Sequence, residues 1–295
     1  MRTDSTSPLQ GRVVAITRPE GQSSGMVELV ESLGGISCLA PTVEIRPPND
    51  GKHVEEFIRE ATRRELDLII FLSVNSVGSL FRVADDAELT NDFLKAMEDV
   101  TVVAIGSKTL DALRGHDVKV KIIPDKQSSQ GILDSLSGID LEGLRIGMPR
   151  SSKADGTLRR TLEERGATVR EVTAYRSGIP NFMNPALNLI KALDRGEVDA
   201  VTFTSASTGR NLFKIANAHA SLAELEKGLR GVVVAAIGPT TGEALKELGV
   251  RVDVVPDEHS TEALIEALVE KLNLKKGELK GICGDCVNKD VCGGG

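Results

Sequence analysis

The segment Asp67-Leu-Ile-Ile-Phe-Leu-Ser73 recurs 132 positions later as Asp199-Ala-Val-Thr-Phe-Thr-Ser205, an apolar run between an aspartate and a serine. The segments Val103-Ala-Ile-Gly106 and Ala235-Ala-Ile-Gly238 are separated by the same 132 positions. The displacement also holds for single residues along the chain, namely Arg18/Arg150, Gly34/Gly166, Phe81/Phe213, Thr109/Thr241, Leu113/Leu245, Val120/Val252, Pro124/Pro256, Asp125/Asp257 and Ser128/Ser260. Because chance does not keep one register over so many matches, the repeat predicts two homologous lobes.

Strand and helix signals alternate along each repeat. In the first repeat, apolar runs predict strands at 13–17, 36–40, 68–72, 100–105 and 118–123. Apolar residues at helical spacing predict helices at 26–33, 76–83, 108–114 and 129–136. Near-continuous Val, Ile and Leu runs that alternate with amphipathic helices are typical of parallel sheets covered on both faces. The predicted fold class is therefore α/β, with each lobe a small doubly wound, flavodoxin-like parallel sheet.

The repeat divides the chain into four half-units, at 12–45, 67–138, 144–177 and 199–270. These half-units could pair in sequence, or the first could join the fourth and leave the middle two as a contiguous lobe. Pro41, Pro47 and Pro48 mark one crossing between half-units, and the segment 171–180 marks the matching one. The pattern is compatible with both pairings.

Composition excludes several classes of function. The formal net charge of −7 argues against general nucleic-acid binding, which needs a surplus of Lys and Arg. The absence of Trp and the single Tyr argue against aromatic platforms that stack bases or flat rings. No P-loop and no dinucleotide-binding glycine pattern follows a predicted strand, so nucleotide binding has no positive signal. The start of the chain has no apolar leader and no apolar run is long enough to span a membrane, which favours a cytoplasmic protein that does not associate with membranes.

Ligands of open parallel sheets bind outside the carboxyl ends of the strands. The residues just beyond the predicted strands are mostly small or hydroxylic, and most of them begin a helix. The candidate binding residues are Thr17, Arg18, Ser73, Asn75, Ser107, Thr109, Arg150, Thr204, Ser205, Ser207, Thr240 and Thr241. Helix N-termini with nearby hydroxyls attract anions, although Ser, Thr and Gly are also the ordinary residues of helix caps and turns. A cap is the simpler interpretation of any one position, and an anion-lined cleft is our prediction for the whole set.

Tyr175 is the only tyrosine and lies at the second crossing, next to Arg176. On its position alone, the simpler interpretation is that Tyr175 has a structural role and packs at the segment that connects the lobes. In that case the phenol has no chemical role.

Cys283, Cys286 and Cys292 form a C-x2-C-x5-C pattern near the end of the chain and are candidate metal ligands. Zinc and iron–sulfur sites usually take four ligands. Only Cys38 remains as a fourth cysteine, and it lies in a predicted strand. We therefore expect a disordered or redox-reactive tail rather than a complete metal site.

Several of these segments resemble the motifs of the uroporphyrinogen-III synthase family. Ala236-Ile-Gly-Pro-Thr-Thr241, followed by Glu243-Ala-Leu245, is similar to the best-preserved signature of that family. The other similar segments are Ile70-Phe-Leu-Ser73, Ala104-Ile-Gly-Ser-Lys-Thr109, Val172-Thr-Ala-Tyr175, Phe203-Thr-Ser-Ala-Ser207 and the stretch from Pro256 through Ser260-Thr-Glu-Ala-Leu264. Each motif is short, but their order and spacing are specific, and the resemblance covers roughly residues 11–272.

The resemblance implies that the first half-unit joins the fourth. One lobe then comprises residues 1–42 and 178–271, and the other comprises residues 46–172. Residues 43–45 and 173–177 form a two-stranded hinge between them, and residues 272–295 form a flexible tail that contains the cysteines.

The resemblance also implies a reaction. Members are lyases that work without a cofactor and cyclise hydroxymethylbilane to uroporphyrinogen III, with loss of water and inversion of ring D, in porphyrin and haem biosynthesis. The substrate is a small molecule with acetate and propionate carboxylates on every pyrrole. A monomer is implied, with the upstream enzyme hydroxymethylbilane synthase as a candidate partner.

Individual residues match the motifs of the family. Tyr175 matches a tyrosine proposed to assist departure of the hydroxyl as a general acid. Thr109 and Thr241 match threonines that line the cleft. Asn75 departs from the pattern, because some members have a basic residue there. Positions that match loop residues in contact with substrate carboxylates are Ser73, Ser205 and Ser207.

Two other classes of protein fit parts of the pattern. A non-catalytic, two-lobed protein that binds or senses small anions would use the same binding residues and give Tyr175 no chemical role. An electron-transfer or metallo-regulatory protein would be built around the C-terminal cysteines.

Overall fold

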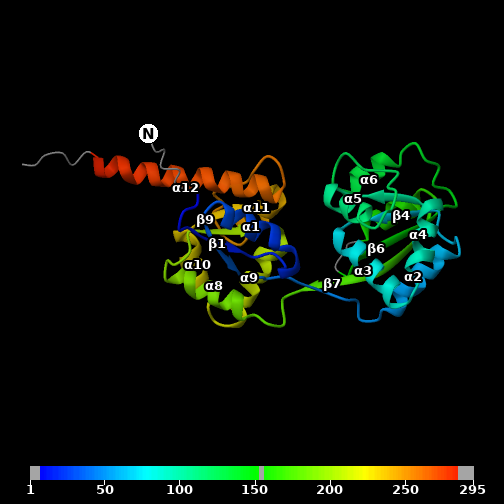
Figure 1. The fold of residues 1–295 in the computed structure, drawn as a ribbon, viewed down its shortest axis with the longest axis horizontal. Coiled ribbons are helices and arrows are strands. Elements are labelled where there is room, and N and C mark those ends of the chain that lie inside the picture. The colour runs from blue at the N-terminus through cyan, green and yellow to red at the C-terminus, as the bar shows by residue number, and fades with distance from the viewer. Residues whose placement is uncertain (1–6, 153–155, 285–295) are drawn as a thin grey trace, which may run out of the picture. The chain divides into compact units, whose positions relative to one another are not determined.

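The chain divides into two compact units. The computed structural model describes residues 7–152 and 156–284. The first unit is Met1–Glu44 with Gly178–Gly295, and the second unit is Ile45–Ser177. Each unit has a sheet of its own with helices packed against it (Figure 1). The fold is therefore α/β, and the first unit combines two segments that are far apart in the sequence.

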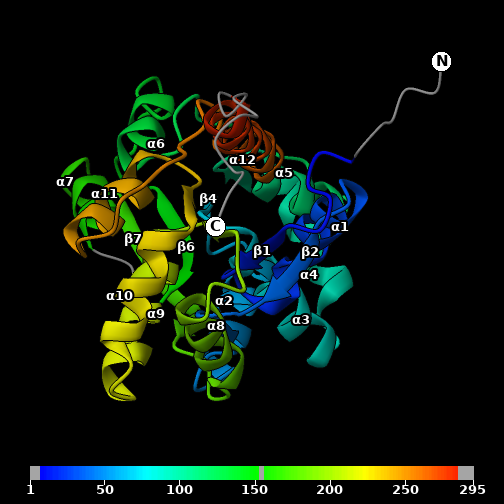
Figure 2. The ribbon, with the colours of Figure 1, turned by 90° about the vertical axis from the view of Figure 1, so that its left-hand side faces the viewer.

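Within the described residues, the sheet of the first unit has four strands in the order β2-β1-β8-β9, and its neighbouring strands are parallel. The strands are β1 (Val13–Ile16), β2 (Ile36–Leu39), β8 (Ala200–Phe203) and β9 (Val233–Ala236). The helices are η1 (Glu20–Gln22), α1 (Ser24–Ser32), α8 (Asn184–Asp194), α9 (Ala206–Ala218), α10 (Leu222–Gly231), α11 (Pro239–Glu247) and α12 (Thr261–Gly284). Helices α8, α9 and α10 gather on one face of the sheet and α1 and α12 on the other, as Figure 1 and the turned view in Figure 2 show.

In the described part of the second unit, the sheet has five strands in the order β3-β7-β6-β4-β5. The strands are β3 (Glu44–Arg46), β4 (Leu68–Phe71), β5 (Thr101–Ala104), β6 (Arg145–Ser151) and β7 (Thr168–Gly178). The helices are α2 (Lys52–Thr62), α3 (Val74–Asp86), α4 (Thr90–Asp99), α5 (Ser107–Arg114), α6 (Ser129–Ser135) and α7 (Thr157–Glu164). The pairs β4–β5, β4–β6 and β6–β7 are parallel.

Side chains that alternate along each strand build a core on both faces of each sheet. In β4, Ile69 and Phe71 pack into one core of the second unit, and Leu68 and Ile70 pack into the other. All four residues are buried. Because successive side chains of a strand point to opposite faces, a strand buried on both faces needs apolar residues at every position. This explains the near-continuous apolar runs of the sequence.

The displacement of 132 residues recurs in the pairing of the strands. The β1–β2 ladder begins at Val13 opposite Ile36, and the β6–β7 ladder begins at Arg145 opposite Thr168. The β4–β5 and β8–β9 ladders are related in the same way. Strand β1 also pairs with β8, and β4 pairs with β6. The first half-unit is thus paired with the fourth and the second with the third.

The segment 118–123 does not form the strand that its apolar pattern predicts. Among the described residues, its only strand-type contact is an isolated bridge between Val103 and Ile122. The N–H groups of Lys121 and Ile122 both donate to the carbonyl of Val102, at 2.9 and 3.2 Å. The chain therefore touches the edge of the sheet at a single point. The prediction of a strand was therefore wrong. Pro124, which follows the segment, has no N–H group with which to continue a ladder.

Other elements differ in extent from the sequence prediction. Helices α2 and α8 lie in stretches that the pattern treats as connections, and α4 and α10 are also additional. Strand β7 continues to Gly178, through most of the segment 171–180 that was expected as a crossing. Helix α12 continues to Gly284, beyond position 272 at which a tail was expected to begin. Lys, Glu and Leu, which are frequent in this stretch, are good helix formers.

Candidate functional site

The residues predicted to bind a ligand lie at the carboxyl edge of each sheet. In the second unit, α3 and α5 begin close behind β4 and β5, and in the first unit α9 and α11 follow β8 and β9 in the same way. Thr17 and Arg18 follow β1, Arg150 lies near the end of β6, and Tyr175 lies in the last part of β7. Because neighbouring strands are parallel, these ends meet at one edge of each sheet. Each unit thus gathers its own share of the predicted residues.

Ser73 and Ser205 cap the helices α3 and α9. Ser73 Oγ accepts a hydrogen bond from the N–H of Ser76 at 3.3 Å, and Ser205 Oγ accepts one from the N–H of Thr208 at 3.3 Å. The simpler interpretation of these two serines, as helix caps, is therefore confirmed. Ser205 Oγ also lies 2.9 Å from Ser207 Oγ. The N–H groups in the first turn of a helix point towards its N-terminus, where they attract anions.

The other polar residues of the set occupy different environments. Thr17 is fully buried, and its hydroxyl donates to the carbonyl of Thr202 at 2.8 Å, so it joins β1 to β8. Thr109 and Thr241 are buried in the first turns of α5 and α11. Apart from the two capping serines and the two arginines, the half-buried or exposed members of the set are Asn75, Ser107, Thr204, Ser207 and Thr240.

Arg18 and Arg150 have different surroundings, although 132 positions separate them. Arg150 forms an ion pair with Glu171, and the Arg150 side chain is 10% exposed. The Nε of Arg18 is buried and has no hydrogen-bond partner among the described residues. Burial lowers the pKa of the Arg18 guanidinium, and the negative charge of Glu262 acts in the opposite direction. An unsatisfied, partly buried guanidinium donor is well suited to a carboxylate.

Tyr175 is 9% exposed, and its ring packs in the core that contains residues of α2 and α3. Ser73 Oγ donates a hydrogen bond to its phenol oxygen at 3.1 Å. The backbone on either side is also held, because the hydroxyl of Ser79 donates to the carbonyl of Ala174 and the N–H of Ser152 donates to the carbonyl of Tyr175 at 3.1 Å. Helix α3 and the end of β6 therefore fix the position of the phenol.

Sequence reasoning missed the side chains that anchor the strand ends. Ser79 in α3 holds Ala174, and Asn211 in α9 donates to the carbonyl of Thr42 at 2.8 Å. Ser79 and Asn211 are 132 positions apart, and so are Thr42 and Ala174. The repeat offset was a signal that could have found them. The residue types differ, so a search for identical residues passes over them.

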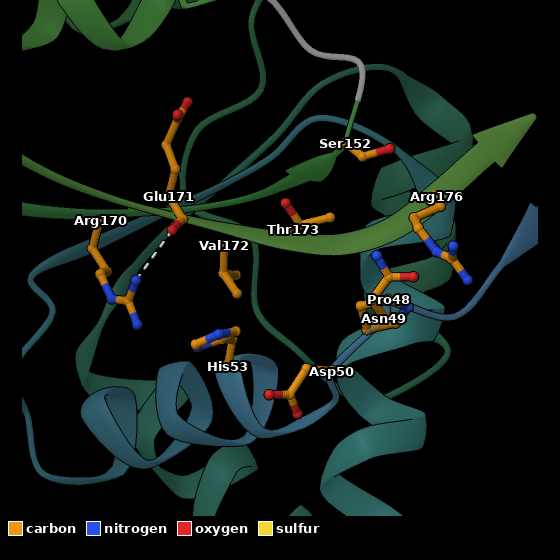
Figure 3. Close-up of a pocket in the computed structure, with 10 residues that line it drawn as sticks. All are labelled: Pro48, Asn49, Asp50, His53, Ser152, Arg170, Glu171, Val172, Thr173 and Arg176. Carbon is orange, nitrogen blue, oxygen red and sulfur yellow. Dashed lines mark hydrogen bonds between the residues drawn. The ribbon is translucent and has the colours of Figure 1, made fainter.

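A cavity of about 560 Å³ lies along β7 in the second unit. Figure 3 shows the side chains that line it, which are Pro48, Asn49, Asp50, His53, Ser152, Arg170, Glu171, Val172, Thr173 and Arg176. Arg170 is already paired, with the carboxylate of Glu60 at 2.9 Å and the carbonyl of Glu171 at 3.2 Å. The cavity contains charges of both signs and none of the predicted binding residues. The strand-end residues, whose groups suit a polyanion, therefore make the stronger candidate site.

Among the described residues, no helix has both the length and the apolar character that a membrane crossing requires. The same part of the chain holds no group of three or more His, Cys, Asp or Glu side chains placed to bind a metal ion. The candidate metal ligands Cys286 and Cys292 lie outside the described residues, and of Cys283 only the backbone, within α12, is described.

The family described as uroporphyrinogen-III synthase HemD matches residues 24–266. A curated relative from Methanothermobacter thermautotrophicus, provisionally named a uroporphyrinogen-III synthase, is 41% identical over 258 residues, which are 86% of this chain and 96% of the relative. The uroporphyrinogen-III synthase of Chlorobaculum parvum is 28% identical over 261 residues, which are 88% of this chain and 99% of that protein. A crystal structure of a mutant uroporphyrinogen III synthase from Thermus thermophilus has the same fold, with a TM-score of 0.62 and 23% identity over 90% of this chain and 100% of that one.

These comparisons favour an enzyme over a non-catalytic anion-binding protein. The match spans most of the chain and includes Tyr175 and the helix starts of both units. The chain therefore belongs to the uroporphyrinogen-III synthase family and is an enzyme of tetrapyrrole biosynthesis.

Proposed function

We propose that this chain cyclises hydroxymethylbilane to uroporphyrinogen III, with loss of water and inversion of ring D. The observation that carries the proposal is the family match over residues 24–266. That range contains Tyr175 and all the predicted binding residues except Thr17 and Arg18. Holding the two ends of the flexible, linear substrate together is the main catalytic contribution expected of such a site.

In this proposal, Tyr175 is the general acid. Its phenol O–H bond breaks, the proton joins the departing hydroxyl group, and water leaves as the C–O bond of the bilane breaks. The carbon left behind bonds to the substituted α-carbon of ring D and gives a spiro intermediate. The bond from that α-carbon to the neighbouring methylene bridge then breaks and re-forms at the unsubstituted α-carbon, which inverts ring D, and the proton that this carbon loses returns to the phenolate.

The carboxylates of the substrate are the second part of the proposal. Hydroxymethylbilane carries acetate and propionate groups on every pyrrole, so it needs many dispersed partners. The N-terminal amide groups of α3, α5 and α9, those that follow Pro239 in α11, and the hydroxyls around them supply such partners in each unit. The unsatisfied Nε of Arg18 adds a charge-assisted donor in the first unit.

We also propose that the units are homologous, flavodoxin-like lobes joined by a hinge of residues 43–45 and 173–177. The strand orders β2-β1-β8-β9 and β7-β6-β4-β5 support a duplication, because the 132-residue offset relates them strand by strand. The change from one unit to the other at residues 44–45 and 177–178 supports lobe boundaries at 1–42, 46–172 and 178–271. A hinge would allow the enzyme to accept a bulky, flexible substrate.

The proposed reaction is tested with freshly prepared hydroxymethylbilane. Purified protein is incubated with it, the products are oxidised, and the porphyrin isomers are separated by chromatography. The expected product is mainly isomer III, whereas the uncatalysed reaction forms the uninverted isomer I. Formation of isomer I alone, at the spontaneous rate, would rule out the proposed activity.

Replacing Tyr175 by Phe tests the acid. Loss of a general acid usually lowers a rate by about 100-fold to 10,000-fold, and we expect kcat to fall by at least about 100-fold. The ring is retained, so the thermal unfolding midpoint should change little. An unchanged kcat would remove Tyr175 from the chemistry and leave positioning as the whole mechanism.

The remaining parts of the proposal concern the setting of the enzyme. We expect a monomer that works in the cytoplasm without a cofactor and receives its substrate from hydroxymethylbilane synthase. Light scattering of the purified protein measures its mass in solution, and a mass of two or more chains would contradict the monomer.

A further inference from the structure

The hydroxyl of Ser73 makes two hydrogen bonds with different directions. It accepts from the N–H of Ser76 at 3.3 Å and donates to the phenol oxygen of Tyr175 at 3.1 Å. The backbone of Ser73 is extended at the N-cap of α3, with φ −165° and ψ 154°, and it follows the buried strand β4. A sheet strand on one side and a helix on the other therefore hold this hydroxyl in place.

The repeat provides an internal comparison. Ser205 caps α9 with nearly the same backbone, φ −165° and ψ 158°, and accepts the equivalent amide at 3.3 Å. Its hydroxyl contacts Ser207 at 2.9 Å. The position that corresponds to Tyr175 is Val43, which has no hydroxyl. The Ser205 cap therefore forms without a tyrosine at the corresponding position. The hydrogen bond between Ser73 and Tyr175 is thus not a consequence of helix capping.

We propose that Ser73 is a positioning residue that orients the phenol of Tyr175 and stabilises its conjugate base. This inference rests on the proposed function, in which Tyr175 donates a proton. Because Ser73 donates to the phenol oxygen, the hydrogen of the phenol is directed away from Ser73 and is free for the departing hydroxyl. When that proton leaves, the oxygen becomes negative and the bond from Ser73 becomes charge-assisted and stronger. No bond to Ser73 itself is made or broken.

The structure thus gives the side chain of Ser73 a task different from the contact with substrate carboxylates that the family resemblance implied. Its oxygen caps α3 and its hydrogen serves Tyr175.

The sequence makes this contact directly observable, because the protein has one tyrosine and no tryptophan. The intensity ratio of the tyrosine Fermi doublet in a Raman spectrum reports whether a phenol oxygen accepts a hydrogen bond. We expect the ligand-free protein to show an accepting phenol, Ser73→Ala to lose that signature, and Ser73→Thr to restore it. Ser205→Ala, which removes the matching cap in the other unit, should leave the spectrum unchanged.

Kinetics test the consequence for catalysis. We expect Ser73→Ala to lower kcat about tenfold, with a smaller change in KM, and Ser73→Thr to recover most of the loss. In a Tyr175→Phe background, Ser73→Ala should have little further effect on kcat, because the group that it serves is gone. Thermal unfolding of Ser73→Ala and Ser205→Ala measures the cost of losing a cap in each unit.

Each failure has a separate meaning. A Raman signature that does not depend on Ser73, or equal effects of Ser73→Ala on kcat with and without the phenol, would overturn the inference. Full activity of Tyr175→Phe would remove both the acid and its positioning residue but leave the isomer assay positive. Absence of isomer III from the wild-type reaction would instead overturn the proposed function, and the Raman contact would remain as a structural feature only.

Discussion

At the scale of single residues, Arg18 and Arg150 show how one residue type takes two roles at related positions. Arg150 is paired with Glu171, whose side chain is 25% exposed. The Nε of Arg18 is buried without a partner in the described part of the chain. A guanidinium already paired with a carboxylate contributes to stability, and one that lacks a paired carboxylate is available to a ligand.

Replacing each arginine by Gln tests whether Arg18 binds the substrate and Arg150 stabilises the fold. We expect Arg18→Gln to raise the KM for hydroxymethylbilane about tenfold, the effect of losing one charge-assisted hydrogen bond, with little change in the unfolding midpoint. Arg150→Gln leaves Glu171 with only the longer ion pair to Arg159, at 3.9 Å, and should lower the free energy of unfolding by roughly 1–3 kcal/mol. Steady-state kinetics and urea unfolding measure the two effects. A larger rise in KM for Arg150→Gln than for Arg18→Gln would reverse the assignment.

Asp67 lies directly before the β4 strand and carries a shift that can be measured. Arg145 donates to both of its carboxylate oxygens, at 2.8 and 3.0 Å, and the backbone N–H of Arg145 adds a bond of 2.9 Å. The side-chain bond with Arg145 lowers the pKa of the Asp67 carboxyl, against the opposing effect of burial. A carboxyl whose pKa is lower in the folded state stabilises the protein above its unfolded pKa, and the stabilisation is lost as the pH falls through the folded value.

Asp67→Asn should therefore be less stable than the wild type near pH 7, and the difference should shrink as the pH falls through the lowered pKa of the Asp67 carboxyl, because both proteins then carry an uncharged side chain. The effect should be modest, because the Asp67 side chain is 36% exposed. Urea midpoints at a series of pH values test it. A difference that is constant over the whole series would show that the charge of Asp67 is not the cause.

At the scale of an element, helix α6 depends on a glycine for its first turn. Ser128 caps the helix and accepts from the N–H of Gly131 at 3.1 Å. A Cβ at Gly131 would lie 2.1 Å from the carbonyl oxygen of Lys126. Ala is a better helix former than Gly by about 1 kcal/mol, but a backbone contact this short must displace the turn, and the clash is the larger effect.

Gly131→Ala should lower the free energy of unfolding by roughly 1–3 kcal/mol, within the range for overpacked sites. Gly138, just after the same helix, provides the control, because a Cβ added there would meet no heavy atom of the described residues within 4 Å. Gly138→Ala should be neutral or slightly stabilising. Chemical unfolding of both variants decides the matter, and equal stabilities would show that the turn before α6 adjusts without cost.

At the scale of the whole molecule, the two units have separate cores. Phe57 is fully buried in a core of the second unit, and Phe203 is fully buried in a core of the first. Each core is formed only by residues of its own unit. A cavity made in one core should therefore weaken the packing of that unit without removing any contact from the core of the other.

Phe57→Ala should destabilise the second unit by about 3–5 kcal/mol, the usual cost of such a truncation. In hydrogen exchange, we expect amide protection to fall within residues 45–177 and to persist in β1, β8 and β9. Phe203→Ala should give the reverse pattern. If either variant lowered amide protection equally in both units, the two units would unfold as one cooperative body.

The sequence by itself determined the fold class, the repeat and the place of the candidate residues along the chain. Apolar periodicity is local, so the strands β1, β2, β4 and β5 could be predicted to within about two residues of their ends. The position of polar residues directly after predicted strands is also local, and it placed Ser73 and Ser205 at helix starts. The segment 118–123 failed because its pattern suits a strand while its place at the sheet edge allows only one bridge.

The tertiary structure decided between the two pairings that the periodicity left open, and it alone decided what each candidate residue touches. Two pairings of the half-units fit the same pattern, and the β1–β8 and β4–β6 ladders selected one of them. Ser73 and Tyr175 are 102 positions apart, and the different surroundings of Arg18 and Arg150 likewise arise from residues distant in the chain. Such contacts depend on long-range strand pairing, which a local periodicity does not encode, and they are the contacts on which the proposed chemistry rests.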